Sequence, residues 1–405
     1  MRKHNVLIVS VYYPPIESIA SNRIYSFAKY LDKERFNIFV HTVDEGKEYQ
    51  NDLANVTVSR VKNDVFFKPL LFNKRTNKFV HYCKVIYNIA VNRLTKNSYQ
   101  KWIDNSFKYL KKEIRNKNID LIISSFSPDA SHILALKLKK EFPHLKWIAD
   151  FRDEMSKSPY LDKKTKIKYK NLEDEIFKYA NAVTSVSSPI LDEFKQMSKN
   201  ENIIFKEIRN GYDFDLKEQK SNNELFTITY TGNFYGSRNP DNFLKALSNF
   251  VEKRGVKVSL KLIGVKTHFN IPNNLEGMVE IVKSVPHKEI TKYLLNSDAL
   301  LLIHPSNGRK GIFTGKLFEY LASLKPIIAL VDEEDVASKL IKKANAGYVS
   351  DNDNIKKIEE ILEKVYNEYR DNIKREYNIN IIKQHHRREQ AKRLESLIRE
   401  LIDER

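Results

Sequence analysis

The sequence predicts an α/β protein made of two doubly wound domains that face each other across a cleft. Three observations support this prediction. Short apolar segments rich in β-branched residues alternate with longer segments of helical periodicity. This alternation occurs twice, once on each side of a polar stretch, and it is typical of parallel sheets covered by helices on both faces. The length of 405 residues is sufficient for two such domains.

The first series of predicted strands occupies the N-terminal half. Its members are residues 6–10, 36–42, 56–61, 121–125, 146–150 and 182–186. Segments of helical periodicity separate most of them, for example at 21–31 and 133–142. We therefore expect a Rossmann-like domain over residues 1–212.

The second series begins after a polar segment at 213–224, which we interpret as an interdomain linker. Its predicted strands are residues 226–232, 258–263, 279–282, 299–304, 326–330 and 347–349. They predict a second Rossmann-like domain over residues 225–378. The tail, 379–405, is predicted to be helical, with an apolar stripe suited to packing back on the N-terminal domain: Ala391, Leu394, Leu397, Ile398 and Leu401.

Composition limits the class of protein. Hydrophobic residues make up 41% of the chain, with 22 Phe and 21 Tyr, which is enough for substantial cores. The single cysteine, Cys83, excludes an internal disulfide and a cysteine-based zinc site, and it fits a reducing cytoplasm. The ten histidines form no spaced ligand set, so we predict no metal site. We also see no secretory signal and no apolar run of membrane-spanning length, and expect a cytoplasmic protein that is soluble or peripheral.

The net charge of +18 is concentrated in residues 62–117, where 14 lysines and arginines stand against three acids. Aromatic and aliphatic residues are interleaved with these charges. Such a segment suits contact with an anionic membrane at the inner face of the plasma membrane. The open alternative is that the aromatics pack inside and the lysines are merely solvated. Nucleic acid is a less favoured partner.

The most informative stretch of the second domain is 314–329. It predicts a loop ending at Thr314, a helix that opens near Gly315, and then a buried strand. The first N–H groups of that helix would lie at the carboxyl edge of a parallel sheet, where doubly wound folds bind phosphate. Lys316 adds positive charge there, and Glu319 can accept hydrogen bonds from a sugar diol. The alternative is an ordinary strand-to-helix turn with a surface lysine.

A second loop points to the same kind of ligand. After the first strand of this domain, Gly232 and Gly236 allow close approach of backbone to a ligand, and Arg238 precedes a predicted helix. A bidentate guanidinium suits a diphosphate, although a solvated loop arginine is the simpler reading. His304, at a strand end near this loop, is a further candidate. The predicted donor-side residues are therefore Gly232, Gly236, Arg238, His304, Thr314, Gly315, Lys316, Leu317 and Glu319.

In the first domain, a dense charge cluster ends the fifth predicted strand: Asp150, Arg152 and Asp153. These side chains cannot all be buried without pairing. One reading is a structural Arg–Asp pair that holds the loop. The other is that a carboxylate meets a sugar or acceptor hydroxyl, since carboxylate–hydroxyl hydrogen bonds suit sugar recognition.

Two other loops of the first domain are predicted to enter the cleft. The loop at 11–22 lacks the glycine pattern of a dinucleotide fingerprint, so NAD is not expected. Ser21 or Asn22 is predicted to cap the following helix. The candidate acceptor-side residues in these loops and the adjoining helices are Tyr13, Ser21, Arg23, Ser127 and His132; for His132, burial in a helix packing is an open alternative.

These motifs together resemble a known family. Residues 230–238, Tyr-Thr-Gly-Asn-Phe-Tyr-Gly-Ser-Arg, followed by 315–322, Gly-Lys-Leu-Phe-Glu-Tyr-Leu-Ala, are similar to the donor-binding half of retaining GT-B enzymes of glycosyltransferase family four. Motifs at 12–15, 125–128, 149–153, 183–188 and 210–213 resemble that family in the expected order. The resemblance covers nearly the whole chain, with an acceptor-binding N-terminal domain and a nucleotide-sugar-binding C-terminal domain.

The resemblance implies a reaction. A sugar would move, with retention, from a nucleotide-diphosphate sugar to an acceptor hydroxyl, without a cofactor or an obligatory metal. Arg238, Lys316 and the amides around Gly315 would stabilise the departing diphosphate, and Glu319 would hold the ribose. Asp150 and Asp153 would orient sugar or acceptor. We expect a glycan or lipid-linked acceptor in bacterial surface-glycan synthesis.

One departure from the family pattern keeps alternatives open. A second glutamate that the family often carries, eight residues before Glu319, is replaced by Gly311, and Arg309 and Lys310 lie in the same loop. One alternative is a non-catalytic protein that binds a nucleotide sugar or a polyanion on the same scaffold. Another is a GT-B nucleotide-sugar epimerase, which would require acid and base groups converging on the sugar.

Overall fold

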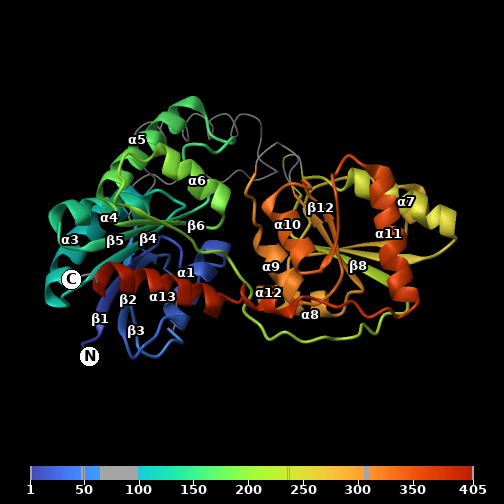
Figure 1. Ribbon diagram of the computed structural model, residues 1–405, viewed down its shortest axis with the longest axis horizontal. Coiled ribbons are helices and arrows are strands. Elements are labelled where there is room, and N and C mark those ends of the chain that lie inside the picture. The colour runs from blue at the N-terminus through green and yellow to red at the C-terminus, as the bar shows by residue number, and fades with distance from the viewer. Residues whose placement is uncertain are drawn as a thin grey trace. The chain divides into compact units, whose positions relative to one another are not determined.

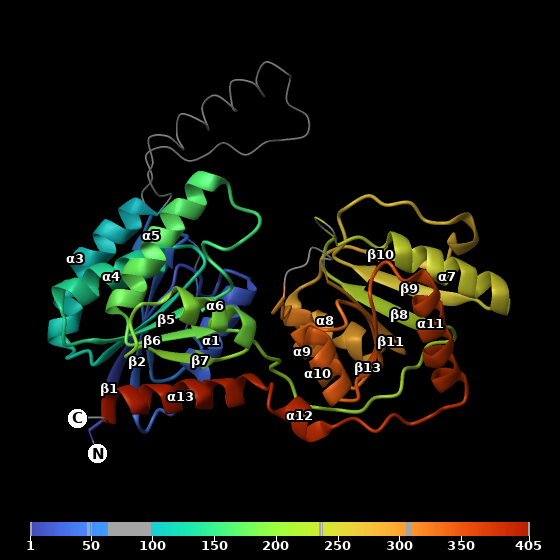
Figure 2. The same cartoon turned by 45° about the horizontal axis from the view of Figure 1, so that its top comes forward.

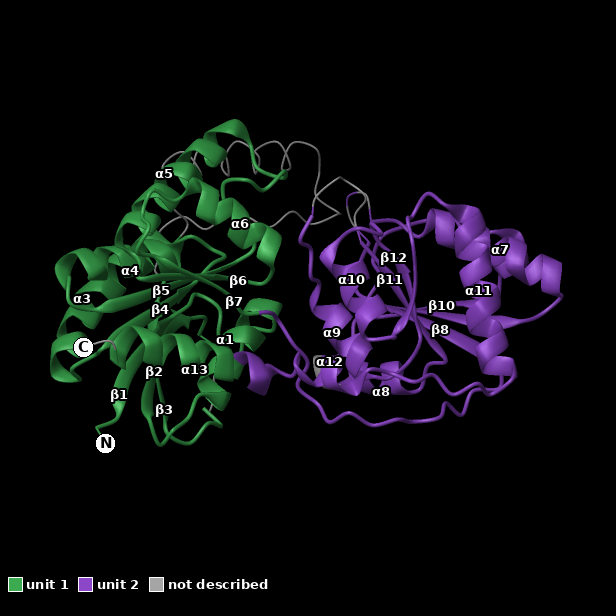
Figure 3. Cartoon of the chain, in the orientation of Figure 1, with its two compact units in different colours: residues 1–208, 391–405 green, residues 209–390 purple. Residues whose placement is uncertain are grey.

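The computed structural model describes residues 2–46, 49, 51–63, 99–234, 236, 238–304 and 310–403 (Figure 1). Contacts within the chain divide it into two compact units (Figure 3). Unit 1 contains residues 1–208 and 391–405, and unit 2 contains residues 209–390.

Unit 1 is built on a seven-stranded sheet with the order β3-β2-β1-β4-β5-β6-β7, in which all neighbouring strands are parallel. The strands are β1 His4–Val9, β2 Phe36–Asp44, β3 Val56–Lys62, β4 Leu121–Ser125, β5 Lys146–Arg152, β6 Ala182–Ser185 and β7 Ile204–Glu207. The helices of this unit are α1 Ile19–Tyr30, α3 Gln100–Asn116, α4 Ala130–Glu141, α5 Lys163–Tyr179 and α6 Ser188–Met197.

Both faces of this sheet are buried, because side chains of successive strand residues point to opposite faces and both sets are apolar. One core joins the sheet to α3, α4, α5 and α6. The other includes Ile8 of β1 and Phe27 of α1. The long helix α13, Arg387–Asp403, contributes Leu394, Leu397, Ile398 and Leu401 to that second core, and Figure 1 shows it in red beside α1. The C-terminal stripe is therefore part of unit 1.

Unit 2 is built on a six-stranded parallel sheet with the order β10-β9-β8-β11-β12-β13 (Figure 2). The strands are β8 Phe226–Thr231, β9 Val258–Ile263, β10 Val279–Val282, β11 Ala299–Ile303, β12 Ile327–Leu330 and β13 Gly347–Ser350. The helices are α7 Asp241–Arg254, α8 His287–Leu295, α9 Gly315–Ala322, α10 Val336–Lys343, α11 Ile355–Arg370 and α12 Ile379–Lys383, with a short 3-10 helix at Asn273–Leu275. Separate cores fill the two faces, one under α7 and α11 and one under α9 and α10.

The prediction of two doubly wound α/β domains is confirmed by these two sheets. In each sheet, the first three strands extend from the centre to one edge, and the later strands extend from the centre to the other edge. The direction of the strand order therefore reverses between β1 and β4 in unit 1 and between β8 and β11 in unit 2. Ligands of doubly wound folds bind at such a switch point, beyond the carboxyl ends of the strands. The reversals therefore indicate where to look for a site in each unit.

The predicted linker, 213–224, falls within unit 2 rather than between the units. The segment is hydrogen-bonded to the rest of that unit. The Ser221 hydroxyl donates to Asp298, and the ammonium of Lys325 donates to the backbone carbonyl of Gln219 at 2.6 Å. In the part of the chain that the structure describes, no helix has the length and apolar character needed to cross a membrane. Most of the predicted membrane-contact segment 62–117, namely 64–98, lies outside the described residues.

Candidate active site

The candidate site lies at the switch point of unit 2. The loop after β8 leads to α7, and the loop after β11 leads to α9, so both emerge at the carboxyl edge of neighbouring strands. Helix α9 begins at Gly315, with Thr314 as its N-cap residue. The Thr314 side chain makes no capping hydrogen bond, so it leaves the N–H groups of the first turn of α9 to other partners.

Lys316 reaches from the first turn of α9 back to the end of β8. Its ammonium nitrogen lies 4.0 Å from the centre of the Tyr230 ring. A Cβ atom added to Gly232 would come within 3.0 Å of both Cε and Nζ of this lysine, and Gly232 also has a φ of 97°. A side chain at residue 232 would therefore have a strained backbone and would push the end of Lys316 aside. The nitrogen is buried and has no hydrogen-bond partner among the residues that the structure describes.

Two further basic groups lie near this ammonium. Burial, and then the charge of Arg238, lower the pKa of Lys316 to about 7, while Glu319 opposes them. Burial, Arg238 and Lys316 lower the pKa of His304 to about 3. Both Arg238 and His304 are buried. The charges of Lys316 and Arg238 repel each other at this buried edge beside a neutral His304, and an anion bound between them would relieve that repulsion.

The surrounding residues fix this arrangement. The hydroxyl of Tyr320, on α9, accepts from the backbone N–H of Thr231 at 3.0 Å and lies 3.1 Å from the hydroxyl of the same threonine. Helix α9 is thereby tied to the end of β8. The carboxylate of Asp335 accepts from the N–H of Gly311 at 2.6 Å, which holds the loop before α9. His304 Nε2 lies 3.3 Å from the Thr314 hydroxyl.

The remaining predicted residues of this unit have different positions. Glu319 lies one turn into α9 and is partly exposed. Leu317 is fully buried in the core beneath α9, so its side chain does not line the site, although its N–H belongs to the first turn. Gly236, with a φ of 58°, lies in the loop before Arg238. Arg309 lies outside the described residues, and Lys310 forms an ion pair with Asp332.

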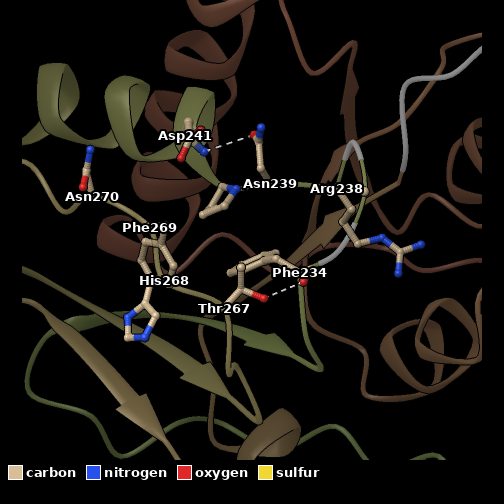
Figure 4. Close-up of a pocket in the computed structure, with 10 residues that line it drawn as sticks. Phe234, Arg238, Asn239, Asp241, Thr267, His268, Phe269 and Asn270 are labelled. Carbon is tan, nitrogen blue, oxygen red and sulfur yellow. Dashed lines mark hydrogen bonds between the residues drawn. The ribbon is translucent and has the colours of Figure 1, made fainter. Parts of the chain in front are cut away.

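A cavity of about 610 Å³ adjoins Arg238 (Figure 4). Its floor is aromatic, because Phe234 stacks on Tyr230 at 4.5 Å between ring centres and meets the edge of Phe269 at 5.7 Å. Figure 4 shows the guanidinium of Arg238 pointing away from Asn239 and His268. The lining residues are Phe234, Gly236, Arg238, Asn239, Pro240, Asp241, Thr267, His268, Phe269 and Asn270.

The wall formed by residues 267–270 contains none of the residues predicted from the sequence. Their position in the sequence could have identified them, because they follow β9 and so lie at the same carboxyl edge of the sheet. This loop is also hydrogen-bonded to the predicted loop after β8. The Asn233 side chain accepts from the N–H of Lys266 at 2.8 Å, and the Thr267 hydroxyl donates to the carbonyl of Phe234 at 2.6 Å.

In unit 1, Asp150 forms a buried network. Arg23 holds it with two hydrogen bonds, from Nε at 3.0 Å and from Nη2 at 2.7 Å. The hydroxyls of Ser125 and Thr184 donate to the same carboxylate at 3.0 and 2.8 Å. Burial alone would raise the pKa of Asp150, but Arg23, the hydrogen bond from Thr184 and the charge of Arg152 together outweigh burial and lower the pKa. This geometry favours the structural reading of an Arg–Asp pair, with Arg23 rather than Arg152 as the partner.

Arg152 and Asp153, the other two residues of that cluster, do not take part in the hydrogen bonds described for Asp150. Arg152 is buried, has a φ of 60°, and donates from Nε to the carbonyl of Phe126. It therefore fixes the turn after β5 against the turn after β4. Asp153 is exposed at the end of the same turn.

The acceptor-side candidates are mostly interior. Tyr13 and Ser21 are fully buried, and their hydroxyls have no hydrogen-bond partner within the described ranges. The cap of α1 is neither Ser21 nor Asn22 but Ser18, whose hydroxyl accepts from the N–H of Ser21 at 3.0 Å. Ser127 is exposed.

His132 is a core residue of α4. Ser124 Oγ accepts from the Trp147 indole N–H at 2.8 Å and lies 2.7 Å from His132 Nδ1. The ring packs 4.7 Å from that of Phe151, and burial lowers the pKa of His132 to about 3. His132 is therefore neutral at pH 7, which agrees with the helix-packing alternative.

Comparison with known proteins bears on the same unit. Residues 212–393 match the family model described as glycosyl transferases group 1. This match contains the loops around Arg238 and Lys316. No curated protein sequence matches the chain significantly.

Solved structures extend the comparison to both units. Sucrose-phosphate synthase (tll1590) from Thermosynechococcus elongatus is 13% identical, with a TM-score of 0.65 over 99% of this chain and 100% of that one. A glycosyltransferase from Rickettsia africae is 14% identical, with a TM-score of 0.63 over 100% of both chains. The lipopolysaccharide outer core galactosyltransferase WaaB is 14% identical, with a TM-score of 0.57 over 98% and 99%. The fold is GT-B. At these identities the likeness to solved structures concerns the fold alone.

Proposed function

We propose that this protein is a retaining glycosyltransferase that moves a sugar from a nucleoside-diphosphate sugar to an acceptor hydroxyl. The observation that carries the proposal is the buried Lys316 ammonium, which has no hydrogen-bond partner among the described residues and lies near Arg238 and His304 at the switch point. The match of residues 212–393 to glycosyl transferases group 1 supports it.

The chemistry that these residues suit is stabilisation of a leaving diphosphate. The bond from the anomeric carbon to the phosphate oxygen breaks, and the acceptor oxygen bonds to the same face of that carbon. The departing diphosphate gains negative charge, and the proton of the acceptor hydroxyl passes to a phosphate oxygen. Fixed positive groups in a buried site stabilise such developing charge without having to reorganise.

Each residue of unit 2 has a distinct part in this proposal. Lys316 and Arg238 would hold the diphosphate, together with the first N–H groups of α9. We assign the ribose to Glu319, which lies one turn further along α9. These cationic groups would balance the diphosphate without a metal ion, and the sugar nucleotide would be a substrate rather than a cofactor.

The acceptor and the setting follow from the proposed reaction. We propose a lipid-linked or polysaccharide acceptor in bacterial surface-glycan synthesis, bound by unit 1, with the protein peripheral to the inner face of the plasma membrane. The high positive charge of the chain supports this setting. The exposed Asp153 is the carboxylate of the turn after β5 that remains accessible to an acceptor.

The test is thermal unfolding with a panel of nucleoside diphosphates and their sugar conjugates, with and without EDTA. A ligand that binds the folded state raises the midpoint by mass action. We expect one base to give a shift that EDTA does not change, and the matching sugar nucleotide to release its diphosphate when acceptor is present. Binding without turnover on any acceptor would favour the non-catalytic alternative, and no shift with any compound would contradict the donor site.

A further inference from the structure

A surface of unit 1 combines exposed apolar side chains with several lysines. Tyr160 is 62% exposed and Ile167 is 55% exposed, although both are large and apolar enough to favour burial. They lie seven positions apart, in the loop before α5 and in its second turn. In Figure 2 this helix lies between α4 and α6 of unit 1.

The charge around these two side chains is strongly positive. Residues 157–170 contain six lysines and one acid, Asp162. Lys168 pairs with Asp129 at 2.7 Å and Lys170 pairs with Asp174 at 2.5 Å. Within the described ranges, the other four lysines make no ion pair with a carboxylate: Lys157, Lys163, Lys164 and Lys166.

Helix stability does not account for these lysines. The side chain of Asp162 caps α5 by accepting from the N–H of Thr165 at 3.0 Å, so Lys163 and Lys164 are the first two residues of the helix. The N-terminal end of a helix carries partial positive charge, so lysines there weaken the helix slightly. These lysines therefore do not stabilise the helix, which leaves their charge available for a contact outside it.

The scaffold beneath this surface is rigid. The buried stripe of α5 contains Glu173, Ile176 and Phe177. Glu173 accepts from the backbone N–H of Ser156 at 2.9 Å and from its hydroxyl, which ties the base of the loop to the helix. Lys163, Lys164 and Ile167 are exposed, and Ile167 lies three and four positions after the two lysines, so the three share one side of the helix.

We propose that this face is a docking surface for an anionic lipid bilayer. We call it the α5 surface and define it as Lys157, Tyr160, Lys163, Lys164 and Ile167. Lysines near an anionic leaflet contribute about 1 kcal/mol each, and exposed aliphatic and aromatic side chains enter the boundary between headgroups and acyl chains. The α5 surface therefore presents lysines and exposed apolar side chains together, on α5 and the loop before it.

This proposal differs from the sequence-based prediction, which placed membrane contact at 62–117. It does not depend on the glycosyl-transfer proposal, because lipid binding and nucleotide binding can be measured separately. A basic surface also attracts nucleic acid, but exposed Ile167 has no counterpart in backbone phosphate binding, so the lipid bilayer is the favoured partner.

The experiment is co-sedimentation of the full chain with phosphatidylcholine vesicles, and with vesicles in which about one third of the lipid is phosphatidylglycerol. We expect binding to the anionic vesicles only. The double variant Lys163→Gln/Lys164→Gln should lose about thirtyfold in partition coefficient, from two charges at about 1 kcal/mol each. Ile167→Ser should lose about fivefold on the same vesicles, from a partly inserted side chain.

Matched controls locate the effect. Lys253→Gln/Lys257→Gln removes the same charge from exposed positions of unit 2, and Lys108→Gln/Lys112→Gln does so on α3, within the originally predicted segment. We expect less than about threefold change for both, and unfolding midpoints and nucleotide-induced shifts equal to wild type for all variants. The proposal would be overturned if the wild-type protein did not bind anionic vesicles, or if it bound a single-stranded oligonucleotide instead. So would controls that lose as much as Lys163→Gln/Lys164→Gln.

Discussion

The ammonium nitrogen of Lys316 lies 4.0 Å from the centre of the Tyr230 ring and fills the space that a side chain at residue 232 would need. A cation in this position, close to Arg238, costs free energy in the unliganded protein. This cost in free energy is consistent with a site that binds an anion. Four predictions follow from this relationship and from the buried pair in unit 1.

Lys316→Met should stabilise the unliganded protein, because a side chain of similar length replaces a buried charge that Arg238 repels. We expect the free energy of unfolding to rise by about 1 to 3 kcal/mol in chemical denaturation at pH 6.5. Lys342→Met, which removes the same charge from an exposed position on α10, should change it by less than about 0.5 kcal/mol. A large loss of stability in Lys316→Met would mean that the contact with Tyr230 is structural.

Diphosphate binding should take up a proton above neutral pH. The pKa of Lys316 falls from 10.5 to about 7 in the unliganded protein. Between these values the unfolded chain binds more protons than the folded one, so Lys316 makes stability rise with pH across that window. A bound diphosphate restores the higher pKa. Calorimetry at pH 8 in two buffers of different ionisation heat should detect this proton uptake in wild type and not in Lys316→Met. Equal proton uptake in both proteins would exclude Lys316 as the group that is protonated.

Gly232→Ala should weaken both folding and binding. The new methyl group would meet Lys316 at 3.0 Å, and a φ of 97° is strained for alanine. We expect a loss of about 1 to 3 kcal/mol in unfolding free energy and at least about tenfold in diphosphate affinity. Gly255→Ala, where φ is 62° and the space is open, tests strain alone and should lower stability without changing affinity. Normal affinity in Gly232→Ala would argue against the position of Lys316.

Asp150→Ala should destabilise unit 1 by about 3 to 5 kcal/mol, because it leaves Arg23 buried without its partner. Adding Arg23→Met should recover much of that loss, since the stranded charge is then removed as well. The lowered pKa of Asp150 also contributes stability that is present above the unfolded value, about 3.9, and lost as pH falls through the folded value. Wild-type stability in Asp150→Ala would refute the structural reading.

Local patterns predicted the helix start at Gly315 for a physical reason. A helix start next to a buried strand depends on neighbouring residues, so the position of Lys316 at the opening of α9 follows from spacing. The switch point then places this helix beside the loop of Arg238. Leu317 shows the limit of such reasoning, because its side chain faces the core.

Unit 1 was harder to predict because its key contacts join distant parts of the chain. Arg23 and Asp150 are separated by 127 positions, and no local pattern pairs them. The cap of α1 lies three residues earlier than expected, since Ser18 rather than Ser21 reaches the open N–H groups. The edge strand β7 was missed because its four residues are all only half-buried.

The central claim is that Lys316 belongs to a diphosphate site. Isothermal titration of the full chain with the common nucleoside diphosphates at pH 7 tests it most directly, on wild type, Lys316→Met and Lys342→Met. We predict that one diphosphate binds wild type and Lys342→Met equally, and binds Lys316→Met about tenfold to hundredfold more weakly, since a charged hydrogen bond is lost. Equal affinity for all three proteins would contradict the account.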